Sequence, residues 1–143
     1  MIARTLLTLA QAMPLVPTPL ANPPHPVPVA RSPIDWPALP LLPYRRTPQP
    51  TASMVAFVAT EARRNECPRP MPVDGRTRLQ VDVAVLIGED HLVRATIPRA
   101  IGCPTVEQYA AGLVVSFARG NLMPQFVNDG GWYRASLRFD WTE

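Results

Sequence analysis

The sequence predicts an α+β fold in which two helices cover one face of a small three-stranded antiparallel sheet, preceded by a disordered proline-rich segment. Proline accounts for 19 of the 143 residues. Most of these prolines lie before residue 51, where we expect no packed core. From residue 51 onward, apolar residues recur with a helical period in two stretches and alternate with polar ones in three others. The resulting order, helix, strand, strand, helix, strand, is typical of the α+β class.

The first helix is predicted over residues 54–64. Its apolar residues recur three and four positions apart, which gives the helix one apolar face, and Ser53 is available as its N-cap. Arg63 and Arg64 lie in the last turn, where positive charge is favourable. Prolines between residues 68 and 72 prevent the helix from continuing.

Two strands joined by a turn follow. Residues 78–87 alternate apolar with polar side chains, which predicts a strand with one buried face. Near the end of this stretch Ala84 and Leu86 are also apolar, so we expect burial on both faces there. A turn at residues 88–91 leads to a second alternating stretch, residues 92–97. We expect these two strands to form an antiparallel hairpin.

The second helix carries the longest apolar stripe of the chain. Apolar residues recur at helical spacing from residue 106 to residue 117. Thr105 precedes them as N-cap, Gln108 completes a capping-box pattern, and Gly120 is placed to end the helix.

The last segment, residues 132–141, predicts a third strand because its residues alternate again. One side is mostly large and apolar, which predicts a buried face. The opposite, outward side carries the following residues: Trp132, Arg134, Ser136, Arg138 and Asp140.

The chain has two cysteines, Cys67 and Cys103, and two histidines that lie far from them in the sequence. Tetrahedral zinc needs four such ligands, so we predict no metal site and no cofactor. In an exported protein the two cysteines would form one disulfide that ties the two helices together at one end. In a cytosolic protein they would stay buried thiols.

Residues 1–21 have the order of a secretory signal peptide: one arginine, a short apolar run, and Ala-Gln-Ala at residues 10–12, with a second possible cleavage position after Ala21. The alternative is a disordered or weakly helical N-terminus. Prolines interrupt the apolar stretch too early for a transmembrane span. With a functional signal the protein would be periplasmic, and without one it would be cytoplasmic.

Residues 22–50 are predicted to form an extended, polyproline-II-like spacer ahead of a folded domain at residues 51–143. A ligand for a proline-recognising domain is one alternative for the spacer. Four side chains could instead let its end lie against the domain: Trp36, Leu41, Leu42 and Tyr44.

Charge and motifs argue against two classes of function. Arginines exceed acids only before residue 51, so the folded part is neutral and shows no basic stripe, and we expect no nucleic-acid binding. The chain has no nucleophile-elbow, zinc-protease or phosphate-loop motif. His91 and Ser116 have no predictable catalytic partner. We therefore do not expect an enzyme.

Three stretches resemble the C-terminal domain of TonB-like energy transducers, over roughly residues 54–141. They are the first two strands with their turn (RLQVDVAVLIGEDHLVRATI), the helix after Gly-Cys-Pro (GCPTVEQYAAGLVVSFARGNLMP) and the closing strand (GGWYRASLRFDW). In the family, the helix ends in an aromatic-x-Pro pattern that is followed by a glycine and a strand ending in aromatics. The corresponding places here hold Leu122-Met123-Pro124, Gly130-Gly131 and Phe139-Asp140-Trp141.

The resemblance implies a periplasmic protein-binding module whose final strand pairs with an extended segment of an outer-membrane receptor or another envelope partner. It places the contact on the strand Trp132–Asp140, whose outward side chains would recognise the partner. The alternative is that these side chains form an ordinary solvated strand face. The N-terminal membrane helix of the family is missing from this pattern, so we expect a stand-alone form. A second hypothesis is a disulfide-stabilised structural or accessory envelope domain, with no strand-mediated partner and no catalytic activity.

Overall fold

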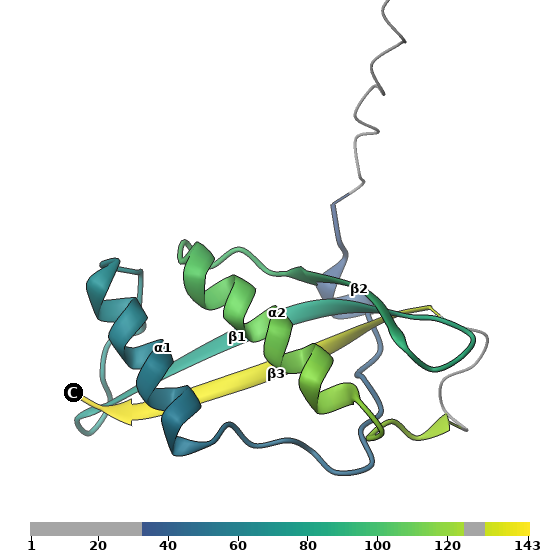
Figure 1. Ribbon diagram of the computed structural model, residues 1–143. Helices are drawn as coiled ribbons and strands as arrows, with labels where there is room; N and C mark the ends of the chain where they lie inside the picture. Colours follow the sequence, from purple (N-terminus) through teal and green to yellow (C-terminus); the bar gives the residue numbers. More distant parts are fainter. Residues whose placement is uncertain (1–32, 125–130) are drawn as a thin grey trace, which may run out of the picture. The chain divides into compact units, whose positions relative to one another are not determined.

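The computed structural model describes residues 33–124 and 131–143 (Figure 1). The predicted signal peptide, residues 22–32 of the predicted spacer and most of the loop before the last strand lie outside this part. The described elements, in chain order, are a short 3-10 helix η1 (Trp36–Ala38), α1 (Ala52–Arg64), β1 (Arg76–Ile87), β2 (Val93–Pro98), α2 (Pro104–Ala118) and β3 (Gly131–Thr142). The predicted α+β class and element order are confirmed.

The three strands form one antiparallel sheet in the order β2-β1-β3. The central strand β1 pairs with β3 without a register shift, from Arg76 opposite Thr142 to Ile87 opposite Gly131. β1 and β2 form the expected hairpin, with one irregularity near its turn. Consequently, β3 lies at an edge of the sheet, with one side paired to β1 and the other facing away from it.

Both helices lie on the same face of the sheet (Figure 1). The core between them is fully buried, and its members include Val81 and Val83 from β1, Phe139 from β3, and Val114 from α2. Burial of each such side chain contributes roughly 1.5 to 3 kcal/mol. Ala84, on the other face of β1, is also buried, as expected for the end of that strand.

Both helices start two residues earlier than predicted. α1 begins at Ala52, and its N-cap is Thr51 rather than Ser53, because the Thr51 side chain accepts a hydrogen bond from the Met54 N–H at 3.4 Å. α2 begins at Pro104 with Cys103 as N-cap, so Thr105 lies inside the first turn. In place of a hydroxyl cap, the Glu107 carboxylate accepts from the N–H groups of Ile101 and Cys103, at 2.8 and 3.1 Å.

Cys67 and Cys103 form the predicted disulfide, with their Cα atoms 5.3 Å apart. Cys67 follows α1 and Cys103 caps α2, so the bond joins the end of one helix to the start of the other. Both cysteines are buried within the core.

The described end of the proline-rich segment lies against the domain, which is the alternative that the sequence left open. Residues from Ile34 onward belong to the same compact unit as the rest of the fold. Leu42 is 5% exposed and joins the core, and Tyr44 packs against it. The ring of Trp36 lies over the guanidinium of Arg99, with 5.6 Å between the ring centroid and the guanidinium carbon. This contact is on the side of the sheet away from the helices. The predicted spacer therefore ends well before residue 50.

Candidate functional site: the outer edge and outer face of the sheet

We call the side of β3 that faces away from β1 the outer edge, and the face of the sheet opposite the helices the outer face. Arg134 shows which backbone groups point to the outer edge. Its N–H donates to the Pro40 carbonyl at 2.8 Å, and its carbonyl accepts from the Leu42 N–H at 2.9 Å. Because backbone groups alternate in direction along a strand, those of Ser136, Arg138 and Asp140 point the same way.

The first half of the outer edge is occupied by the chain itself. Leu41 forms a parallel bridge with Arg134, so residues 40–42 add a short parallel strand to the sheet. Burial of Leu42 holds this strand in place. Its continuation is bonded to the loop after α2: the Arg45 N–H donates to the Asn121 carbonyl at 2.7 Å, and the Arg45 Nε donates to the Leu122 carbonyl at 2.9 Å.

The second half of the outer edge is open. Within residues 33–124 and 131–143, no hydrogen bond pairs the outward backbone groups of Ser136, Arg138 or Asp140. A groove of about 210 Å³ runs beside Ser136–Arg138, and residues 47–50 border its other side. Two of these four border residues are prolines, which have no N–H to donate to the strand.

On the outer face, the buried carboxylate of Asp82 is the centre of a polar cluster whose other members are exposed. Its carboxylate accepts from Ser136 Oγ at 2.6 Å, from Gln80 Nε2 at 2.9 Å and from Arg99 at 3.5 Å. Burial raises the pKa of Asp82, but these hydrogen bonds together with the charge of Arg134 outweigh it and hold the pKa below its ordinary value. The cluster ties β1, β3 and the end of β2 together.

Asp140 joins a second, exposed charge cluster on the same face. Arg76 and Arg78 of β1 both contact its carboxylate, with Arg76 Nε at 2.7 Å and Arg78 Nε at 3.3 Å. The hydrogen bond from Arg76 is the main cause that lowers the pKa of Asp140. One carboxylate thus serves two guanidinium groups.

The arginines of β3 are less well paired than those of β1. Arg138 is exposed and makes no ion pair with any described residue. The Nε of Arg134 is buried without a hydrogen-bond partner in the described part of the chain. The Trp132 side chain is 39% exposed at the start of the strand.

The structure thus places all five predicted contact residues on one strand with their side chains on the outer face, but it gives them different surroundings. Arg134 is bonded through its backbone to residues 40–42, and Asp140 is held in ion pairs. The sequence left open that the end of the proline-rich segment lies against the domain, but it did not predict that residues 40–42 close one half of the edge and that residues 47–50 border the other. Leu41 and Leu42, an apolar pair among prolines, were the available signal.

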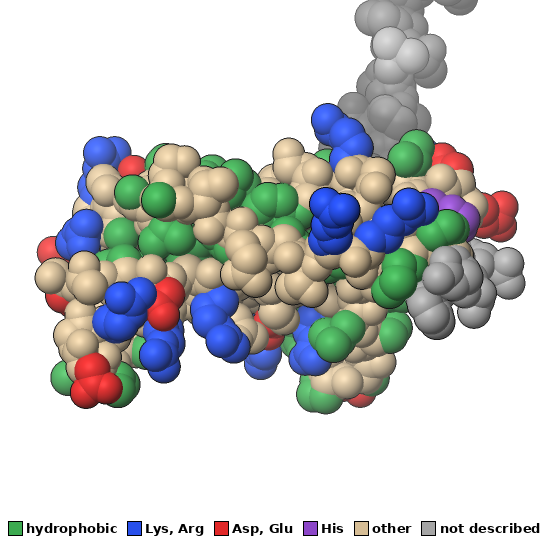
Figure 2. All heavy atoms as spheres, turned by 90° about the horizontal axis from the view of Figure 1, so that it is seen from below, with side chains coloured by type: hydrophobic (Ala, Val, Ile, Leu, Met, Phe, Trp, Pro, Cys, Tyr) green, Lys and Arg blue, Asp and Glu red, His purple; other side chains and the backbone are tan. Residues whose placement is uncertain are grey.

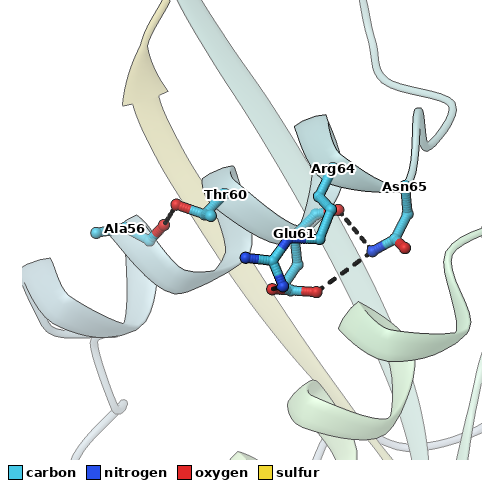
Figure 3. A network of polar contacts seen from close by, with 5 residues as sticks. All are labelled: Ala56, Thr60, Glu61, Arg64 and Asn65. Atoms are coloured by element: carbon cyan, nitrogen blue, oxygen red, sulfur yellow. Dashed lines mark hydrogen bonds and ion pairs between the residues drawn. The ribbon is translucent and has the colours of Figure 1, made fainter.

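By contrast, the polar contacts near the end of α1 join residues of the helix and its C-cap to one another (Figure 3). Glu61 accepts from Arg64 at 3.2 Å, while Asn65 Nδ2 donates to the Glu61 backbone carbonyl at 2.8 Å. Thr60 Oγ1 donates to the Ala56 carbonyl at 2.9 Å. These bonds satisfy the last turns of the helix, and we assign them a structural role.

The described residues contain no group of three or more His, Cys, Asp or Glu placed to hold a metal ion. None of the helices in the ranges 33–124 and 131–143 is both long and apolar enough to cross a membrane. Comparison with family models, with curated proteins and with solved structures found no match for this chain.

Proposed function

We propose that this chain is a protein-binding module that captures an extended segment of a partner by strand addition along the open half of the outer edge of β3. The observation that carries the proposal is the contrast at that edge. Arg134 is already paired with an added strand from the same chain, whereas Ser136, Arg138 and Asp140 present the same backbone groups without a described partner. Strand addition needs unpaired donors and acceptors in register, and this edge supplies them.

The neighbouring surface supports this use of the edge. The groove beside Ser136–Arg138 is bordered by a proline-containing segment that cannot fully satisfy the strand itself. An incoming strand would lie between that segment and β3, or displace it. On its inner side β3 is held by the unbroken pairing with β1, so the edge is presented by a rigid element.

We further propose that the module works in the periplasm, as the resemblance to TonB-like C-terminal domains implies. The disulfide supports an oxidising compartment, because such bonds persist in exported proteins and are rare in the cytosol. A receptor of the outer membrane or another envelope protein would supply the captured segment.

The experiment compares Ser136→Pro with Ser136→Ala. Both variants lose the hydroxyl that donates to Asp82, but only proline also removes the outward N–H. This N–H is not part of the ladder with β1, so the proline variant is expected to fold. Binders are first selected with the wild-type protein from a library of random 12-residue peptides and then titrated against both variants, whose folding is checked by thermal melting.

We expect Ser136→Pro to bind the selected peptides at least about tenfold more weakly than Ser136→Ala, because one backbone hydrogen bond and the local fit are lost. A peptide N-methylated at alternate amides should lose binding to the wild type in the same way. Equal binding by two folded variants would reject strand addition. A library that yields no binder would favour the alternative, a disulfide-stabilised structural domain without a strand-mediated partner.

A further inference from the structure

We infer that the segment captured at the open half of β3 is acidic, with Asp or Glu at alternate positions separated by small apolar residues. This inference rests on the proposed strand addition and names the chemistry of the partner. It is carried by the charges of the outer face, which are mostly positive.

The outer face of the described sheet holds more arginines than its carboxylates can neutralise. We call its charged side chains the arginine face; they are Arg76 and Arg78 from β1, Arg99 after β2, Arg134 and Arg138 from β3, and the carboxylates Asp82 and Asp140. Five positive groups against two negative ones leave an excess of three. In Figure 2, arginine side chains follow one another along the lower part of the surface, with acidic side chains among them.

The two carboxylates of this face are already shared. Asp140 accepts from Arg76 and Arg78, and Asp82 accepts from Arg99 while the charge of Arg134 acts on it as well. Arg138 has no carboxylate partner among the described residues. It also borders the groove beside the open edge. The positive charge left over is therefore centred where an added strand would pass.

An added strand would meet this charge with every second side chain. Strands in a sheet lie about 4.8 Å apart, and alternate residues of each strand point to the same face. Side chains of the partner that point to the same face as the outward residues of β3 would thus lie next to Arg138. The long side chains of the other arginines of the arginine face could also reach them. Carboxylates at those positions gain cross-strand pairs, whereas lysines there would be repelled.

The remaining side chains of the partner would point to the opposite face of the sheet, on the side of the buried Leu137. The groove in which the added strand would lie is also bordered by Pro48 and Pro50 and has a volume of about 210 Å³, which leaves room for small or medium side chains only. Valine and threonine suit both this limited space and the extended backbone. The predicted pattern is therefore acidic, small, acidic, small.

The test uses the full chain and three synthetic peptides that differ only at the alternate positions: Ac-Thr-Glu-Val-Glu-Val-Glu-Thr-NH2 and its copies with Gln or Lys in place of each Glu. Binding is followed by backbone amide chemical shifts of the protein. We expect the Glu peptide to bind at least about tenfold more tightly than the Gln peptide, and the Lys peptide to bind most weakly. The preference should shrink in about 0.5 M NaCl, because salt screens exposed charges.

Two charge-reversed variants locate the effect. Arg138→Glu should remove the preference for Glu over Lys, or invert it. Arg119→Glu makes the same change in net charge at the exposed end of α2, away from the open edge, and should keep the preference. An equal response of both variants would show a general effect of net charge and would overturn the inference.

The remaining outcomes separate this inference from the proposed function. If the Glu and Gln peptides bind equally and both depend on the Ser136 N–H, strand addition stands and the acidic partner is wrong. If none of the three peptides binds at millimolar concentration, the predicted pattern is wrong, while the peptide library still decides strand addition. Should a 12-nucleotide single-stranded DNA bind as tightly as the Glu peptide, and equally to Ser136→Pro and Ser136→Ala, the arginine face is a general anion surface and the inference falls.

Discussion

The two halves of the outer edge of β3 have the same construction and different neighbours. Both alternate buried with outward residues, and both lie on the same core through the pairing with β1. At Arg134 the edge is closed by residues 40–42, through two backbone hydrogen bonds. From Ser136 to Asp140 the described chain leaves the same groups open.

The difference between the halves lies in the segment beside them, not in β3. Residues 40–42 pair with the strand because Leu42 enters the core and so fixes the backbone at hydrogen-bonding distance. Residues 47–50 pass the open half, where two prolines lack the required donors. An edge strand is thus completed where an apolar anchor is available and left open where the neighbouring segment carries prolines, so pairing with another chain is limited to the stretch from Ser136 to Asp140.

The largest expected effect on both halves together comes from the disulfide. Cys67 lines one groove with Thr77 of β1 and with Glu143, so the bond lies beside the end of β3. The double variant Cys67→Ala, Cys103→Ala should lower the free energy of unfolding by about 3 to 4 kcal/mol, because a loop of this length is no longer closed in the unfolded chain. Urea unfolding with and without reductant measures the loss.

Reduced wild-type protein is the control for that variant, since it lacks the bond but keeps both sulfur atoms. The two should agree within about 1 kcal/mol, the difference being the small packing change at two buried sites. A variant as stable as the oxidised wild type would show that the bond contributes nothing to either half.

The next effect distinguishes the halves. Leu42→Ala should cost about 2 to 3 kcal/mol, because a buried leucine side chain is replaced by a smaller one and the added strand loses its anchor. The Arg134 amide, which donates to Pro40, should then exchange its hydrogen with solvent much faster and approach the rate of the Ser136 amide.

Leu41→Ala provides a matched control for this prediction. Leu41 is 65% exposed, and its substitution removes the same atoms as Leu42→Ala. The free energy of unfolding should therefore fall by no more than about 0.5 kcal/mol. Equal effects of the two substitutions on the exchange of the Arg134 amide would contradict the role of Leu42 as the anchor.

Periodicity was sufficient to predict the helices, the strands and their order, because burial of one face imposes a period of 3.6 or 2 on the sequence. The disulfide was predicted as well, whereas the sequence left open the order of the strands in the sheet and therefore the edge position of β3. Both N-caps were missed by two residues. For the first helix, Thr51 and Ser53 carry the same hydroxyl group, and only the path of the chain decides which one bonds to Met54.

The position of residues 40–50 could not be predicted from composition. Prolines predict an extended backbone, but an extended backbone can be solvated or added to a sheet, and contacts distant in sequence decide between these. Asp82 was missed for a related reason. Its place on the polar side of β1 was expected, whereas its bond to Ser136 depends on the register between β1 and β3.

The smallest expected effect concerns the polar cluster under the open half. Asp82→Asn should lower the free energy of unfolding at pH 7 by about 1 to 2 kcal/mol, since a buried carboxylate that accepts from Ser136, Gln80 and Arg99 becomes a neutral amide. Asp90→Asn on the β1–β2 turn removes an exposed ion pair with Arg94 instead, and should cost less than about 1 kcal/mol.

The pH dependence identifies the charge of Asp82 as the cause. Its pKa is lower in the folded than in the unfolded protein, so the stability that it contributes is complete above the unfolded value of about 3.9 and is lost as the pH falls through the folded value. The difference in unfolding free energy between wild type and Asp82→Asn should therefore be constant from pH 7 to about pH 5 and should shrink below about pH 4. Urea unfolding measured across this range tests the prediction. A difference that stays constant down to pH 2 would mean that packing around residue 82, and not its charge, joins β1 to β3 beneath the open edge.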